Sequence, residues 1–199
     1  MNIARILFPV KVLGPGNRVA IWVCGCPRRC PGCSNPELWQ QKPEYEITVS
    51  ELKYLIGSIA DSQKIEGFTI TGGEPMEQPE ELAGLIAYLK TISSDVLVYT
   101  GYKYDELRQQ GSKFIDEILR WAAVLIDGQY VEQYNTDVVL RGSENQNIVV
   151  LNDEFKAYYD NFFETAHNQI QNFTTSDGVV SVGIHKRDFL ETLHQKIFE

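Results

Sequence analysis

The chain has 199 residues, of which 43% are apolar and 23% charged, and this composition predicts one globular domain with a substantial core, or one domain with an appendage. Its formal net charge of −9 argues against nucleic acid as a partner, because phosphate binding needs a concentrated basic face. The N-terminal run, interrupted by Pro9, does not resemble a signal peptide, and no apolar run reaches membrane-spanning length, so we expect a cytoplasmic protein with reduced thiols and no membrane partner.

The first predicted strand leads directly into a loop that holds all four cysteines. An extended piece over 9–18 ends in a Gly-Pro-Gly turn, and a buried strand over 19–23 follows it. Beyond the cysteines, Thr48 and Glu51 have the spacing of a helix capping box. The apolar residues at helical spacing after this box are Leu52, Leu55, Ile56 and Ile59.

The order of strand, loop and helix then repeats. A strand over 68–71 precedes the turn Gly72-Gly73-Glu74-Pro75 and a helix, and a strand over 96–99 precedes Thr100-Gly101-Tyr102 and a second helix. A further strand covers 123–127. The inner faces of the two helices are Leu82, Leu85, Ile86 and Leu89, and Phe114, Ile115, Ile118 and Leu119. This alternation predicts parallel strands joined by right-handed crossovers.

The remainder of the chain is less regular. Residues 128–147 are polar and loop-like, and a strand is expected over 148–151. In the tail we expect an aromatic helix that is core or covering layer, a strand over 179–182, and a last helix that includes Phe189, Leu190, Leu193 and Ile197. His167, His185 and His194 show no metal-ligand spacing and are interpreted as surface or structural residues.

The cysteine loop carries the strongest chemical signal. Cys26, Cys30 and Cys33 are spaced C-x3-C-x2-C, so three thiolates can hold three corners of a cubane cluster and leave the fourth iron open for a substrate. Cys24 reads as a small buried residue at a strand end. A zinc site with Cys24 as fourth ligand stays open, although the second C-x2-C pair is missing. A disulfide framework is disfavoured, because neighbouring cysteines cannot join distant parts of a chain.

This spacing is the signature of the radical S-adenosylmethionine enzymes, and Gly72-Gly73-Glu74 resembles their motif that lines the methionine end of that cofactor. Over about residues 8–151 the chain resembles the activating proteins of anaerobic (class III) ribonucleotide reductase. The shared motifs are Gly14-Pro15-Gly16-Asn17-Arg18, Gly25-Cys26, Cys30-Pro31-Gly32-Cys33-Ser34-Asn35 with Trp39, Thr71-Gly72-Gly73-Glu74-Pro75, Thr100-Gly101-Tyr102-Lys103-Tyr104-Asp105-Glu106-Leu107, Asp127-Gly128 and Arg141-Gly142-Ser143-Glu144-Asn145-Gln146. Gly32 stands where many radical enzymes place an aromatic residue against adenine. The activating proteins also have glycine at this position. The tail after residue 151 extends beyond the shorter members.

The resemblance implies an α/β fold: an incomplete, open (β/α) barrel of parallel strands over 1–151, of the radical S-adenosylmethionine type, with a C-terminal α/β extension over 152–199 packed on it. It also implies an enzyme in which Cys26, Cys30 and Cys33 hold a [4Fe-4S] cluster that reductively cleaves S-adenosylmethionine, so that a glycyl radical forms on the reductase large subunit. The electron donor would be of flavodoxin or ferredoxin type.

The candidate cofactor contacts implied by the resemblance are Gly32, Cys33, Ser34, Gly72, Gly73, Glu74, Thr100, Asp127 and Asn145. Plainer interpretations remain for two of these regions: Asp127 as a cap at a strand end, and residues 141–146 as a solvated loop. Two alternatives for the function also remain. One is the same chemistry on another peptide or small molecule, and the other is a non-catalytic metal-binding interaction module.

Overall fold

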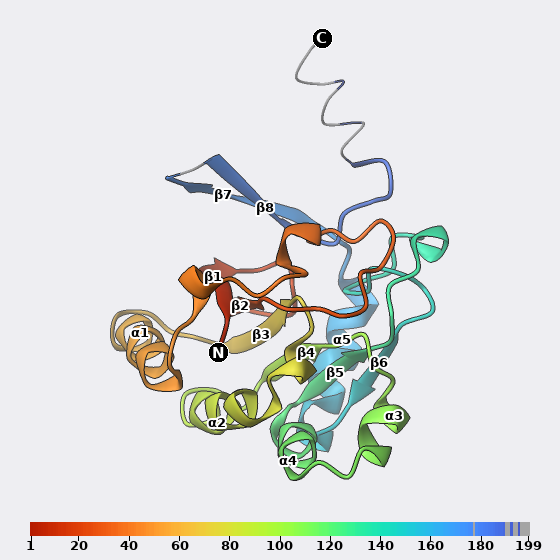
Figure 1. The fold of residues 1–199 in the computed structure, drawn as a ribbon. Helices are drawn as coiled ribbons and strands as arrows, with labels where there is room; N and C mark the ends of the chain where they lie inside the picture. The colour runs from red at the N-terminus through yellow and green to blue at the C-terminus, as the bar shows by residue number, and fades with distance from the viewer. Residues whose placement is uncertain (177, 190–191, 193–194, 196–199) are drawn as a thin grey trace.

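A six-stranded sheet with the strand order β1-β2-β3-β4-β5-β6 forms the centre of the molecule (Figure 1). The computed structural model describes residues 1–176, 178–189, 192 and 195. Strands β2 to β5 run parallel, whereas β1 and β6 pair antiparallel with β2 and β5. The strands are β1 Ile3–Val10, β2 Arg18–Val23, β3 Gly67–Gly72, β4 Val96–Tyr99, β5 Val124–Asp127 and β6 Asn147–Val150. The predicted α/β class with a mostly parallel sheet is confirmed, and the described sheet is open.

The two edge strands correct the sequence-based prediction. The first strand is Ile3–Val10, antiparallel to β2, where we expected only an extended piece over 9–18. Strand β6 runs antiparallel because the segment after β5 contains only the short 3-10 helix η4 (Glu132–Tyr134) and stays at the carboxyl edge of the sheet until β6 starts there. A parallel neighbour would have needed a crossover back to the opposite edge.

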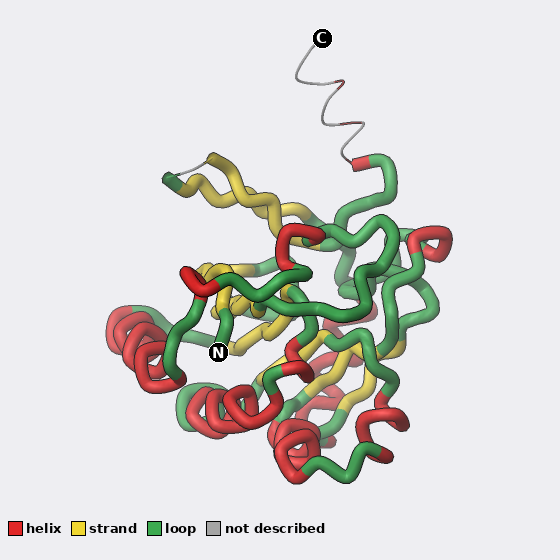
Figure 2. The backbone as a smooth tube through the Cα atoms, viewed as in Figure 1, coloured by secondary structure: helices red, strands yellow, loops and turns green. Residues whose placement is uncertain are grey.

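Helices cover the sheet on both faces. Three of them, α1, α2 and α4, line up along one face, and α5 lies on the other (Figures 1 and 2). Helix α1 begins at the predicted capping box, in which the Thr48 side chain accepts from the Glu51 N–H. The helices are α1 Val49–Ser62, α2 Pro79–Leu89, α3 Tyr104–Gln109, α4 Lys113–Trp121 and α5 Lys156–Thr165, with 3-10 turns η1 Pro36–Leu38, η2 Pro43–Tyr45, η3 Pro75–Glu77 and η5 Asp153–Phe155.

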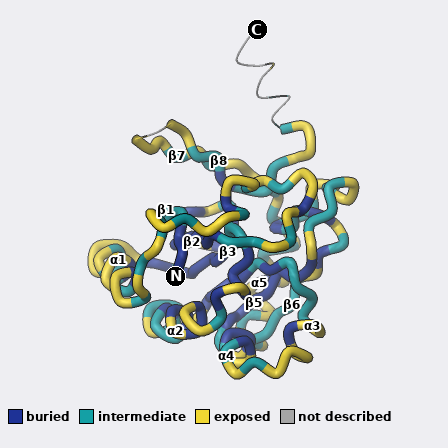
Figure 3. Tube along the Cα trace, viewed as in Figure 1, coloured by how far each residue is buried: buried dark blue, intermediate teal, exposed yellow. Residues whose placement is uncertain are grey.

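Buried residues gather along the central strands (Figure 3), whose side chains alternate between the two faces of the sheet. Ile21 and Ile70 point into the layer of α1, α2 and α4, while Leu97 and Ile126 pack on the other face with Tyr159 of α5. The expected inner faces of α2 and α4 are confirmed apart from Phe114, which is only partly buried. Leu55, in contrast, is 45% exposed, because α1 is the outermost helix of its layer and this residue lies at the edge of the buried stripe.

The C-terminal extension contains α5 and a separate hairpin. The expected strand at 179–182 is β8 (Gly178–Gly183), and its antiparallel partner is β7 (Ile170–Thr175), which the mixed polar sequence IQNFTT did not reveal. Most of the last predicted helix, including Leu190, Leu193 and Ile197, lies outside the described residues, as does His194. None of the described helices is both long enough and apolar enough to cross a membrane.

Candidate cluster and cofactor site

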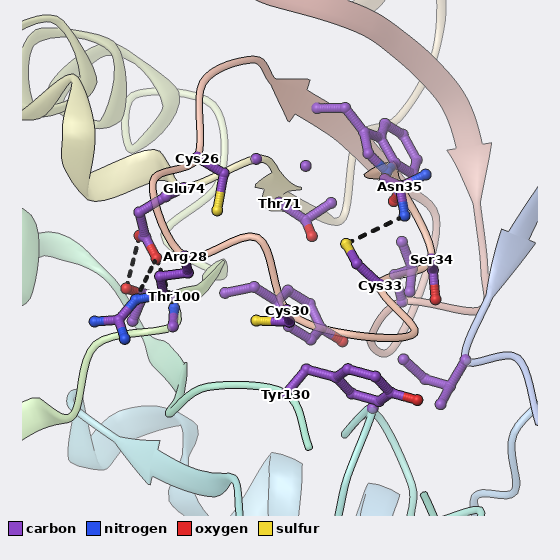
Figure 4. Close-up of a pocket in the computed structure, with 18 of the residues that line it drawn as sticks. Cys26, Arg28, Cys30, Cys33, Ser34, Asn35, Thr71, Glu74, Thr100 and Tyr130 are labelled. Carbon is purple, nitrogen blue, oxygen red and sulfur yellow. Dashed lines mark hydrogen bonds and ion pairs between the residues drawn. The ribbon is translucent and has the colours of Figure 1, made fainter. Parts of the chain in front are cut away.

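One pocket lies at the carboxyl ends of the parallel strands (Figure 4). The cysteine loop follows β2, the Gly-Gly-Glu turn follows β3, and Thr100 follows β4, so the parallel arrangement brings three separate segments to one edge. Open α/β sheets bind their ligands at this edge. Gly128 and Tyr130, in the loop after β5, complete this side of the lining.

Three of the four cysteines line this pocket. The side chains of Cys26, Cys30 and Cys33 surround the same hollow (Figure 4). Cys24, which the sequence analysis separated from the other three, does not line this pocket. It is fully buried in a group of apolar side chains that includes Trp22 and Leu38.

Backbone hydrogen bonds hold the cysteine loop in place. The N–H of Cys26 donates to the Trp39 carbonyl at 2.9 Å, and the N–H of Cys33 donates to the Cys30 carbonyl at 3.2 Å. Burial raises the pKa of the Cys26 and Cys33 thiols, while nearby backbone N–H groups lower it; the Asn35 N–H lies 3.4 Å from Cys33 Sγ. Thiols of this kind become thiolates by coordinating a metal.

The donors around the hollow fit an anionic cluster. Arg28 Nε and Trp39 Nε1 are buried, belong to residues that line the pocket, and have no hydrogen-bond partner within the described structure. Buried donors are normally paired, and the sulfur atoms of a thiolate-bound cluster accept such hydrogen bonds. Among the described residues, no three Cys, His, Asp or Glu side chains are arranged to hold a single metal ion. A cubane cluster does not need that arrangement, because each of its thiolates binds a separate iron.

The two glycines of the turn after β3 lie directly against the cysteine loop. A Cβ on Gly72, whose φ is +111°, would lie 2.5 Å from backbone atoms of Val23, and a Cβ on Gly73 would lie 2.5 Å from the Gly25 carbonyl oxygen. The Gly73 N–H donates to the Val23 carbonyl at 2.7 Å. Only glycine allows this close approach of the two backbone segments.

Glu74 is buried and ties the turn after β3 to the turn after β4. Thr100 Oγ1 and the Gly101 N–H each donate to its carboxylate at 2.7 Å, and the Met76 N–H donates at 3.1 Å. Arg28 Nε lies 3.8 Å away. Burial raises the pKa of Glu74, and these donors oppose that rise. The side chain therefore shapes the pocket wall through its neighbours.

The other candidate residues are divided between the lining and its surroundings. Ser34 lines the pocket. Gly32, Asp127 and Asn145 are described residues that lie outside the lining. The Asp127 carboxylate accepts from the Tyr104 N–H at 2.7 Å and from Asn147 Nδ2 at 2.8 Å, so it joins the start of α3 to the start of β6. Asn145 donates through Nδ2 to the Gln129 carbonyl, and Glu132 packs on Gly32.

Sequence reasoning missed several lining residues. Arg28 had a signal, since it forms a basic pair with Arg29 between two candidate ligands in an acidic chain. Gln146 was noted only within a motif; in the structure it is buried and its Nε2 donates to the Gly128 carbonyl at 2.8 Å, so residues 141–146 are more than a solvated loop. Residues 181–185 of the extension also line the pocket, and no sequence pattern pointed to them.

Comparisons with known proteins agree with this site. The family model described as "4Fe-4S single cluster domain" matches residues 12–149, which include the cysteine loop, and this supports the expected cluster. An anaerobic ribonucleoside-triphosphate reductase-activating protein of Enterobacteria phage T4 is 34% identical over 152 residues, covering 74% of this chain and 93% of the relative.

Two further relatives are also activating proteins, one of the same name and one of another. The protein of that name from Escherichia coli K12 is 31% identical over 147 residues, covering 70% of this chain and 92% of the relative. A pyruvate formate-lyase-activating enzyme of Clostridium pasteurianum is 32% identical over 123 residues, covering 60% of this chain and 48% of the relative. With this coverage, and with three cysteines gathered against a Gly-Gly-Glu turn, the chain belongs to the family of anaerobic ribonucleoside-triphosphate reductase-activating proteins.

Proposed function

We propose that this enzyme activates an anaerobic ribonucleotide reductase by generating a glycyl radical on its large subunit. The observation that carries the proposal is the joining of the cysteine loop and the Gly-Gly-Glu turn at one edge of the sheet, in a chain of the activating-protein family. The open sheet supports its interpretation as an incomplete radical S-adenosylmethionine barrel, because such a barrel leaves one side accessible to a protein substrate.

Cys26, Cys30 and Cys33 would hold the [4Fe-4S] cluster. Held there and reduced by an external donor, the cluster would supply the one-electron chemistry for reductive cleavage of S-adenosylmethionine. Arg28 and Trp39 would donate hydrogen bonds to the anionic groups in the pocket. Hydrogen bonds and exposure tune the potentials of such clusters.

The remaining cofactor contacts are assigned by position. Backbone groups of Gly72 and Gly73 and the side chain of Ser34 would contact S-adenosylmethionine from the lining. Glu74 and Thr100 would fix the turns that carry those contacts. The three candidates outside the lining would position pocket loops, and these are Gly32, Asp127 and Asn145.

We further propose that residues 1–151 form the catalytic core and residues 152–199 an extension packed on it. The separate hairpin and the position of α5 on the second face of the sheet support this division. A flavodoxin- or ferredoxin-type protein would deliver the electron, because sulfonium cleavage needs a cluster near the low end of the range of about −700 to +450 mV.

The decisive experiment uses anaerobically reconstituted, reduced protein mixed with S-adenosylmethionine and the anaerobic ribonucleotide reductase of the same organism. We expect a glycyl radical signal in electron paramagnetic resonance, together with 5′-deoxyadenosine and methionine. The likeness to a pyruvate formate-lyase-activating enzyme favours one alternative, in which the glycine lies on another protein. Formation of 5′-deoxyadenosine and a radical only with that other protein would support this alternative, and absence of S-adenosylmethionine cleavage would refute both.

A further inference from the structure

The C-terminal extension forms one wall of the cofactor pocket. The end of β8 and the residues after it contribute to the same lining as the three cysteines, and the chain of β8 passes beside Cys33 and Ser34 (Figure 4). These residues lie outside the 12–149 segment that the 4Fe-4S family model matches. The wall residues of the extension are Ser181, Val182, Gly183, Ile184 and His185.

Polar bonds attach this wall to the core. In β7, Gln171 Nε2 donates to the Pro9 carbonyl at 2.8 Å and its Oε1 accepts from the Lys11 N–H at 3.0 Å. At the same open end of the hairpin, just after β8, Asn135 Nδ2 donates to the His185 carbonyl at 3.0 Å. The underside of the hairpin is apolar, and the residues packed into the cluster of Val10, Leu13, Trp22 and Leu38 are Phe173, Val180, Val182 and Ile184.

Within this wall, His185 and Ser181 form a polar pair. His185 Nε2 lies 2.9 Å from Ser181 Oγ, and the imidazole packs on the Phe189 ring with centroids 4.2 Å apart. Burial lowers the pKa of His185 and so favours the neutral imidazole, which has one donor and one acceptor nitrogen. A neutral pair of this kind suits hydroxyl groups and ring nitrogens more than a carboxylate.

The position of the pair selects one end of the cofactor. Glu74 and Thr100 lie at one side of the pocket, the extension lies at the opposite side, and the cysteines are between them (Figure 4). S-adenosylmethionine has its amino-acid group and its adenosyl group on opposite sides of the sulfonium. With the amino-acid end beside the Gly-Gly-Glu turn, the adenosyl end must lie toward Tyr130 and the extension.

We propose that His185, supported by Ser181, binds the adenosyl group of S-adenosylmethionine from the extension. This inference rests on the proposed function and adds a binding residue to its site. It replaces the interpretation of His185 as a surface or structural residue. In this chain, residues beyond the segment matched by the family model supply a contact to the nucleoside, through a ribose hydroxyl or an adenine nitrogen.

The test measures binding to the full-length, anaerobically reconstituted protein by calorimetry, with S-adenosylmethionine, 5′-deoxyadenosine and methionine as separate probes. For His185→Ala we expect about twofold to tenfold weaker binding of the first two, as for the loss of one hydrogen bond, with methionine binding unchanged. His185→Gln, which keeps hydrogen-bonding groups, should recover part of the loss. Ser181→Ala makes a smaller change in the same pair and should weaken nucleoside binding in the same direction.

The matched control is His167→Ala, because His167 is an exposed histidine of the same extension, 3.0 Å from Gln169. It should bind all three probes as the parent protein does. Unchanged nucleoside binding in both His185→Ala and Ser181→Ala would overturn the inference, and so would an equal weakening of methionine binding. In either case, cleavage of S-adenosylmethionine by the parent protein would leave the proposed function standing. A parent protein that neither binds nor cleaves S-adenosylmethionine would overturn both.

Discussion

The N–H of Glu74 donates to the carbonyl oxygen of Gly25 at 2.8 Å, and this bond joins the Gly-Gly-Glu turn to the cysteine loop. The two motifs are about fifty residues apart in sequence, and the parallel pairing of β2 with β3 makes them neighbours. Gly73 lies in this turn, and its α-carbon faces the backbone of Gly25 in the cysteine loop. The cysteine loop is therefore positioned by the turn, and disturbing one should disturb the other.

Replacing Gly73 with alanine tests this coupling. The new Cβ would lie 2.5 Å from the Gly25 carbonyl oxygen, a backbone atom that can move only with the cysteine loop. We expect about 1–3 kcal/mol of destabilisation and a clear loss of iron after reconstitution. Gly84→Ala is the matched control, because no atom lies within 4 Å of its new Cβ and alanine is favoured within a helix. Iron content and chemical denaturation measure both effects, and a Gly73→Ala protein with full iron would contradict the coupling.

The cysteine assignment predicts a sharp difference between neighbouring residues. Alanine at Cys26, Cys30 or Cys33 should abolish binding of the iron–sulfur cluster. Cys24→Ala should retain about four irons per chain, because Cys24 is buried among apolar side chains outside the pocket. The visible absorption of the reconstituted protein and its iron content provide the measurement. Loss of iron in the Cys24 variant, with an unchanged fold by circular dichroism, would show that the set of three ligands is wrong.

Glu74→Gln tests whether the buried carboxylate organises the pocket. The Glu74 carboxylate accepts hydrogen bonds from Thr100 Oγ1 and from the Gly101 N–H. A glutamine amide would turn an NH2 group toward one of these donors, and that hydrogen bond would be lost. We expect a loss of about 1–3 kcal/mol in stability and a strong decrease in 5′-deoxyadenosine formation. Glu77→Gln is the control, since its amide oxygen can still accept from the exposed Tyr102 hydroxyl. Equal activity of the two variants would remove Glu74 from the site.

Local patterns predicted the site better than they predicted its surroundings. The cysteine spacing and the turn at Gly72 each lie within one loop, so sequence alone showed them, and the order of strands and helices placed them at one edge of the sheet. The wall formed by 181–185 was hidden because it depends on contacts between segments more than a hundred residues apart. The exposure of Leu55 depends on which helix lies outermost, and this is set by strand order rather than by helical spacing.

A buried ion pair was hidden for the same reason. Arg18 in β2 is fully buried, and its guanidinium donates to the Asp95 carboxylate at 2.6 Å. The carboxylate also accepts from the Tyr159 hydroxyl of α5 at 2.7 Å. The pairing of β2, β3 and β4 brings Arg18 next to Asp95, and the packing of α5 on the sheet adds Tyr159. The charged pair is satisfied within the described structure, which makes burial tolerable.

This pair gives the final prediction, which concerns how the extension is attached to the core. Tyr159→Phe removes one hydrogen bond while the pair stays intact, so we expect about 1 kcal/mol of destabilisation. Asp95→Ala leaves the Arg18 charge buried without its carboxylate, so we expect about 3–5 kcal/mol. Tyr158→Phe, at a 45% exposed position one residue earlier, should have little effect. Chemical denaturation measures all three, and an Asp95→Ala protein as stable as Tyr159→Phe would show that the buried arginine finds another partner.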